Sequence, residues 1–242
     1  MLVVLASLAL HGCGKSLDVS PAALGPVSVD PVVDAPEEPA IPGTLMGGGW
    51  DTLGMTASTF GVAGAAVAAA ALEIASEAPE NAFAQVMRDH DIRPGALFRE
   101  NFERTLCRAG IFTLVEPGEA PNLFVLSVEN LKLRLYGGRL ARLTMKVNGR
   151  LLAADGRELW KQTVDTNDRE SPPFEVRHFI EQPELMHASI DCALGRASAE
   201  LVQSLTDESL KLGIPPGCLN FPSPDLWSDE ASSGGDEELG ER

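Results

Sequence analysis

Hydrophobic and polar residues alternate with a period of two in two stretches of the segment 122–166. Leucines occupy every second position of 131–135 and alternate with Lys132 and Arg134, and the same alternation resumes over residues 141–148. A run of this kind places one row of side chains in a core and the other row in water. The pattern therefore predicts long antiparallel strands with one covered face.

A tight hairpin is predicted at Asp155-Gly156, the residue pair best suited to such a turn, and it leads into a further strand over residues 158–164. A short apolar strand is predicted over residues 111–115, immediately after Gly110. These segments together predict a meander of neighbouring strands.

Apolar residues at helical spacing predict three helices around this sheet. A short helix begins at Pro79, a second spans residues 96–109 and ends at Gly110, and a closing helix spans about 184–205. The expected buried stripes comprise Phe98, Phe102, Leu106 and Ala109 in the second helix, and Met186, Ile190, Ala193, Leu194, Ala197, Leu201 and Leu205 in the closing one. The predicted fold class is α+β, an antiparallel sheet with amphipathic helices packed on one face.

The N-terminus has the pattern of a secretory signal peptide. Residues 2–10 are apolar and too few to cross a bilayer as a helix, which predicts a signal peptide over residues 1–12. The sequence Leu10-His11-Gly12-Cys13 resembles a bacterial lipobox, which implies that Cys13 is lipid-modified and N-terminal after cleavage, with palmitate among its acyl groups. Gly14 after that cysteine favours retention in the outer membrane.

Two segments between the signal peptide and the predicted domain differ sharply in composition. Residues 13–43 contain prolines at short intervals, which predicts a lipid-anchored, extended linker without helix or strand. Residues 44–78 are rich in glycine and alanine, and no charge occurs between Asp51 and Glu73. Three interpretations of that segment stay open: a small-residue periplasmic helix, a membrane-inserting or oligomer-forming segment, and a disordered linker.

The 242 residues can hold one domain of ordinary size with tails. We place the α+β domain at residues 79–227 and expect a disordered, acidic tail over residues 228–242. The formal net charge of −16 disfavours general binding to nucleic acid, because such binding requires a cationic surface that displaces phosphate counterions.

No local pattern for catalysis is present in the sequence. The histidines that follow Cys13, which are His90, His178 and His187, lie on separate predicted elements, and no phosphate-binding loop, dinucleotide fingerprint or HExxH motif occurs. Asp89-His90-Asp91 suggests a metal site at first sight, but adjacent residues of a helix point in different directions. The sequence therefore predicts no enzyme, no metal and no cofactor.

Three cysteines remain after Cys13, and an oxidising compartment favours pairing between two of them. Cys107 and Cys192 both lie off the predicted buried stripes of their helices, and Cys218 lies in a proline-rich segment. We expect one disulfide among the three and one free thiol, with the connectivity open.

Two surfaces are candidates for binding a partner. Arg142, Lys146 and Arg150 share one face of a strand, with Lys132 and Arg134 nearby. This row can meet an anionic glycan, lipid headgroups or an acidic protein, although such a row is more often simply the solvated face of a sheet. The segment 167–183 is predicted as a loop and is the second candidate, since loops carry function more often than strands do.

The order of elements resembles a group of small envelope lipoproteins. The resemblance rests on the helix ending at Gly110 with the strand 111–115, on the strand 122–128, and on the segment 151–160 with its Asp-Gly hairpin. The group includes the curli-secretion lipoprotein, the N-terminal domain of the translocation protein TolB, the Pel exopolysaccharide lipoprotein, and the lipoprotein activators of penicillin-binding proteins. The resemblance covers roughly residues 96–205 and implies an accessory or scaffold role in envelope assembly or export, without catalytic residues.

The sequence thus predicts a non-enzymatic lipoprotein on the periplasmic face of the outer membrane, with an envelope protein or glycan as its partner. One alternative is an oligomeric ring or channel component in which residues 52–72 enter the membrane. Another is a hydrolase whose site is assembled only in space.

Overall fold

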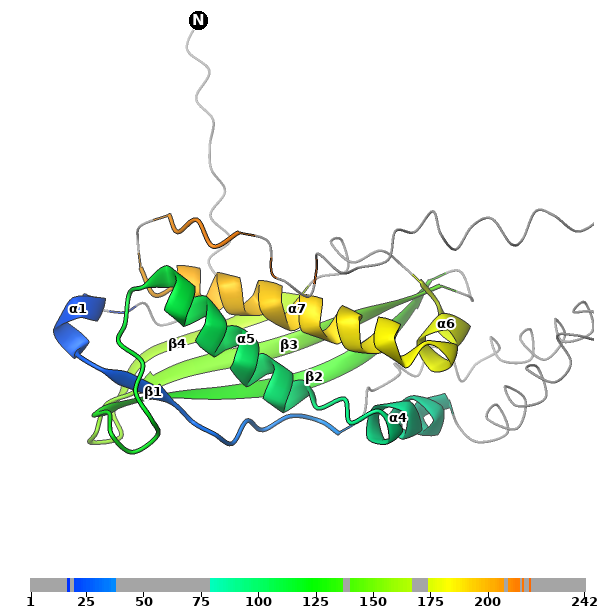
Figure 1. Cartoon of the computed structure of the whole chain (residues 1–242), viewed down its shortest axis with the longest axis horizontal. Helices are drawn as coiled ribbons and strands as arrows, with labels where there is room; N and C mark the ends of the chain where they lie inside the picture. The colour runs from blue at the N-terminus through cyan, green and yellow to red at the C-terminus, as the bar shows by residue number, and fades with distance from the viewer. Residues whose placement is uncertain are drawn as a thin grey trace, which may run out of the picture.

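The computed structural model describes residues 17, 20–37, 79–136, 140–166, 174–206, 209–213, 215 and 218. In these residues the chain forms one sheet with helices against it (Figure 1). The predictions for Cys13, for residues 44–78 and for the tail 228–242 fall outside the described residues.

The sheet is built around two long neighbouring strands. Its strands are β1 (Val27–Val29), β2 (Asn122–Tyr136), β3 (Leu140–Leu152), β4 (Glu158–Thr166) and β5 (Phe174–Glu175). The order is β1-β2-β3-β4, with β5 paired to the start of β3. β1 runs parallel to β2, whereas the other pairings are antiparallel. The sheet is therefore mixed.

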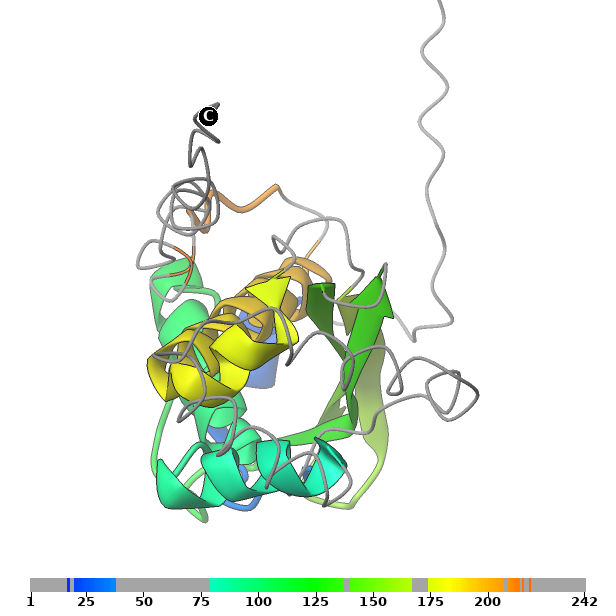
Figure 2. The same ribbon diagram turned by 90° about the vertical axis from the view of Figure 1, so that its right-hand side faces the viewer.

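The helices are α1 (Pro21–Leu24), α4 (Pro79–Asp89), α5 (Pro94–Ala109), α6 (Val176–Glu181) and α7 (Pro183–Gln203). Figure 2 shows α5 and α7 on one side of the curved sheet, and Figure 1 shows α4 and α6 near one end of it. Gly110 ends α5 in a left-handed conformation with φ 64°, which glycine adopts without steric penalty. The predicted fold class, α+β with helices on one face, is confirmed, but the sheet that was predicted to be antiparallel has one parallel pairing, between β1 and β2.

The core lies between the sheet and the two long helices. The ring of Phe124 in β2 contacts Phe102 of α5, Phe112 and Trp160 of β4 at centroid distances of 5.2, 5.6 and 6.0 Å. At Gly149 in β3, an added Cβ would lie 2.7 Å from the Trp160 ring. A glycine is therefore needed at that position for the tryptophan to pack against the sheet.

The sequence pattern located most of these elements correctly. The predicted helices at Pro79, 96–109 and 184–205 correspond to α4, α5 and α7, and the alternating segments correspond to β2, β3 and β4. Every residue of the predicted stripe of α7 is buried, as are Phe98, Phe102 and Leu106 of α5, while Ala109 is partly buried.

The prediction of an unstructured linker was wrong for residues 20–37. This segment contains α1 and β1, and Val27 and Val29 are buried in the core. The flanking residues Pro26 and Pro31 limit the strand to three residues, so proline shortened the element without excluding it. The segment continues along β2, where the amide of Val128 donates to the carbonyl of Asp34 over 2.8 Å.

The predicted strand over 111–115 is reduced to a single bridge between Leu114 and Val27. The reason is that β1 occupies the edge of β2, and residues 111–115 meet only the outer side of β1. The amide of Val27 donates to Thr113 over 2.9 Å and the amide of Val115 donates to Val27 over 3.0 Å.

The predicted loop over 167–183 is not a loop where the structure describes it, because residues 174–181 form β5 and α6. Phe174 is buried and its ring contacts Phe179 at 5.8 Å, edge to face. The apolar contact between these two rings orders the segment against the core. Among the described helices, none has the length and apolar character needed to cross a membrane.

Candidate functional site

The sheet has one face toward the helices and a second face that carries basic residues. In β3, Leu143, Met145, Val147, Gly149 and Leu151 are buried beneath the helix layer. Because successive strand residues point to opposite faces, the even-numbered residues lie on the other side. We call this second side the basic face and define it by Lys132 of β2, Arg142, Lys146 and Arg150 of β3, and Lys161 of β4.

The strand register brings basic residues next to one another on this face. Arg150 lies directly opposite Lys161, and Arg134 lies directly opposite Arg142. Like charges at opposed positions of neighbouring strands repel each other. An anion bound between the exposed side chains of Arg150 and Lys161 would relieve the repulsion between them.

A chain of polar contacts holds the middle of the basic face. Lys146 forms an ion pair with Glu129, a residue at an irregularity in the β2 to β3 register. Hydrogen bonds from the side chains of Lys146 and then Asn148 lower the pKa of the Glu129 carboxyl below its ordinary value of 4.5. The hydroxyl of Thr163 in turn donates to Asn148 Oδ1 over 2.5 Å.

These contacts fix side chains but leave an excess of positive charge. The basic face carries five bases with described side chains, whereas the strands place three acids beside them, Glu129, Glu158 and Asp165. Lys132, Arg150 and Lys161 are exposed. A surface of this sign is unusual in a chain whose formal net charge is −16.

The structure brings the sequence-predicted basic residues to one face of two paired strands. Lys132, Arg142, Lys146 and Arg150 lie there, and Arg134 takes its register position opposite Arg142. Sequence reasoning missed Lys161. The signal that could have found it is the Asp155-Gly156 hairpin, because its register places Lys161 opposite Arg150.

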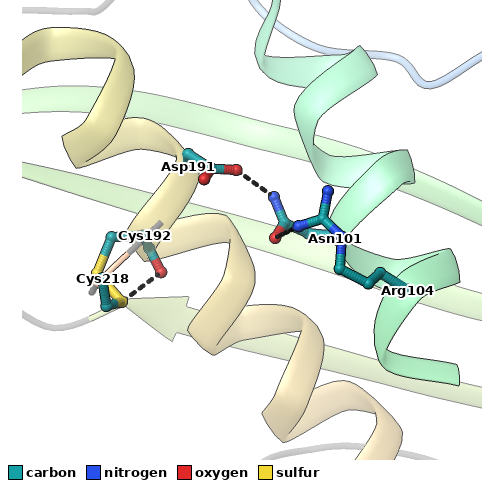
Figure 3. The surroundings of a disulfide bond; sticks show 5 residues. All are labelled: Asn101, Arg104, Asp191, Cys192 and Cys218. Carbon is teal, nitrogen blue, oxygen red and sulfur yellow. Dashed lines mark hydrogen bonds between the residues drawn. A yellow bond between two sulfur atoms is a disulfide. The ribbon is translucent and has the colours of Figure 1, made fainter. Parts of the chain in front are cut away.

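The helix side of the molecule carries a disulfide, shown in Figure 3. Cys192 of α7 and Cys218 form a disulfide, and Cys107 of α5 is exposed and free. The pairing is one of those that the sequence left open. Cys192 is buried, although its position lies off the predicted stripe. The segment after α7 covers the side of the helix that carries Cys192. Pro215 of this segment packs so closely on α7 that a Cβ added at Gly195 would lie 2.6 Å from it.

A buried polar contact joins α5 to α7 beside this disulfide (Figure 3). The Asn101 side-chain amide donates to Asp191 Oδ1 over 2.6 Å and to the Leu97 carbonyl over 2.9 Å. Arg104 donates to Asn101 Oδ1 over 3.4 Å, which satisfies the remaining side of the amide. The contact is a structural link between the helices, because every polar atom of Asn101 has a partner.

The histidines do not assemble into a metal site in the described part of the chain. His90 is exposed in the turn after α4, His178 lies in α6, and His187 is exposed on α7. No group of three or more His, Cys, Asp or Glu side chains that could hold a metal ion occurs in the described residues.

No family model and no curated protein matches this chain. Solved structures resemble it in fold. Protein XCC0632 from Xanthomonas campestris, of the DUF330 family, is 17% identical with a TM-score of 0.34 over 45% of this chain and 59% of that one. The PelC dodecamer from Paraburkholderia phytofirmans is 13% identical with a TM-score of 0.32, over 48% of this chain and 77% of that one.

Lipoprotein GNA1162 from Neisseria meningitidis is 14% identical with a TM-score of 0.26, over 76% of this chain and 99% of that one. This chain spans only 59% of the length of XCC0632. At such identities and TM-scores the likeness carries no argument about the family or the function of this chain.

Proposed function

We propose that this chain is a non-enzymatic, outer-membrane-anchored lipoprotein that serves as an accessory or scaffold protein in envelope assembly or export. In this proposal Cys13 carries the lipid and the domain acts by binding through its basic face. The observation that carries the proposal is the concentration of five bases on one side of β2, β3 and β4.

The geometry supports binding better than catalysis. The bases are spread along three strands, where extended contact with a charged surface is favoured. General acid or base chemistry instead needs groups that converge on one reacting atom. Glu129 has a lowered pKa because it is paired with Lys146, and an ion-paired carboxylate on a strand is a structural group.

The experiment compares complementing variants in a host strain that lacks the gene, with sensitivity to detergent and large antibiotics as the measure of envelope integrity. One variant replaces the four bases Lys132, Lys146, Arg150 and Lys161 by glutamine. Its matched control replaces four exposed bases that lie elsewhere, which are Arg88, Arg93, Arg108 and Lys211.

Both variants lose the same formal charge, so a general charge effect would appear in both. We expect the basic-face variant and Cys13→Ala to fail to complement, and the matched control to behave as the wild type. Full complementation by the basic-face variant, at wild-type protein abundance, would contradict binding through that face.

A further inference from the structure

The folded domain begins very close to the proposed lipid anchor. Leu17 packs against the hydrophobic core, and residues 20–37 belong to the domain. Leu17 lies four positions after Cys13, and an extended chain spans at most about 3.3–3.6 Å per residue, so the tether reaches roughly 14 Å. A domain on such a tether stays at the surface of the membrane that anchors it.

The charges decide which side of the domain faces that surface. The helix layer exposes acidic side chains, among them Asp89 of α4, Glu100 of α5, Glu181 of α6 and Glu184 of α7. The same layer also exposes Arg88 of α4 and Arg108 of α5, so its charges are mixed. The basic face carries an excess of positive charge and is the side that anionic headgroups attract more strongly.

We propose that the basic face rests on the anionic lipid headgroups of the membrane that holds Cys13. This inference depends on the proposed function in one respect, the attachment of lipid at Cys13. It makes the membrane itself the partner of the basic face, and it makes the domain lie flat with its helix layer directed away from the membrane.

The dimensions of the basic face suit a contact of this kind. Arg142 and Arg150 are eight residues apart in β3, which corresponds to roughly 27 Å at about 3.4 Å per residue. Lys132 and Lys161 flank this row from β2 and β4. Attraction between exposed charges at physiological ionic strength is screened beyond about 8 Å, so only a domain held at the surface gains from it.

A lipid chain combined with a basic patch is also a stronger attachment than either alone. The short tether supplies proximity, and the bases supply orientation. A soluble anionic glycan is the alternative ligand of the basic face. A short tether disfavours it, because the tether holds the domain at the membrane surface and away from a distant polymer.

The experiment uses the full chain with Cys107→Ser, coupled through Cys13 to a maleimide phospholipid in vesicles. Cys107 is the exposed free thiol of the described residues, so its replacement directs the coupling. The reactivity of individual lysines toward a water-soluble amine reagent is then measured by mass spectrometry. Vesicles of phosphatidylcholine alone are compared with vesicles that also contain phosphatidylglycerol.

We expect Lys132 and Lys161 to become several-fold less reactive on the phosphatidylglycerol vesicles, and high salt to abolish the difference. Lys211, which is exposed outside the sheet, serves as the internal control and should not change. Arg150→Gln should weaken the protection, whereas Arg108→Gln, which removes the same charge from α5, should not.

Equal reactivity of Lys132 and Lys161 on both vesicles would overturn the inference, and so would protection of Lys211 alone. Protection of the two lysines by dissolved alginate but not by anionic vesicles would assign the face to a glycan instead. Because the coupling is chemical, the result does not depend on acylation in cells. A failure of acylation would thus count against the proposed function, and a failure of protection against this inference.

Discussion

Removal of the disulfide between Cys192 and Cys218 should lower the stability of the domain by an amount that the length of the closed loop determines. The bond joins α7 to the segment after it and closes a loop with a sequence separation of 26. That segment covers one side of α7, because Pro215 lies against Gly195, and Leu212 packs on the core. Cys218→Ser opens the loop with little change in side-chain volume.

The expected loss of folding stability follows from the length of the loop that the disulfide closes. In the chain-entropy model, a cross-link over this separation lowers the entropy of the unfolded chain by an amount worth about 3.5 kcal/mol at 25 °C. For a domain of this size, each kcal/mol shifts the melting temperature by about 2–4 °C, so Cys218→Ser should lower Tm by roughly 7–14 °C.

The assay is thermal and urea unfolding of the oxidised wild type, of Cys218→Ser and of Cys107→Ser. Cys107→Ser is the matched control, because it removes an exposed free thiol, and its Tm should stay within about 1 °C of the wild type. A reducing agent should bring the wild type to the Tm of Cys218→Ser. If Cys218→Ser melts with the wild type while mass spectrometry finds the bond intact in the wild type, the reasoning is refuted.

Three further predictions concern the sheet and the helix contact. Gly149→Ala should destabilise the domain by about 1–3 kcal/mol in urea unfolding, because its Cβ would lie 2.7 Å from the Trp160 ring, and a change below about 0.5 kcal/mol would contradict that close contact. The Glu129 carboxyl, which is paired with Lys146, has a lowered pKa in the folded state, so the stability that the pair contributes is present above pH 4.5 and is lost as pH falls through the folded pKa. Glu129→Gln should remove that part of the pH dependence of the unfolding free energy. An unchanged pH profile would show that the pair contributes nothing to stability. Asn101→Ala should cost about 1–3 kcal/mol, because a carboxylate on α7 loses its buried donor, and full stability in the same assay would show that water replaces the amide.

The sequence was informative wherever burial follows a regular period. Alternation around Leu131 and Leu133 located β2, and helical spacing from Met186 to Leu205 located α7, because each element buries one face against the other. Charge alternation likewise placed Lys146 and Arg150 on the basic face. Local pattern determines such features, so no knowledge of the remaining chain was needed.

Other features depend on contacts between distant parts of the chain. β1 has three residues between prolines and becomes a strand only because β2 supplies a parallel partner. Cys192 is buried by a segment that follows α7, which the periodicity of the helix cannot indicate. Lys161 joined the basic face through the register of the β3 to β4 hairpin. In each case the missing information was a pairing between segments.

The most direct test of the central claim is fatty-acid labelling of the protein in its native host, with the inner and outer membranes then separated on a density gradient. We expect the wild-type protein to incorporate the label and to sediment with the outer membrane, and Cys13→Ala to lose the label and to leave the membrane fraction. A wild-type protein that stays unlabelled and is recovered in the soluble fraction would show that this chain is not a lipid-anchored outer-membrane protein.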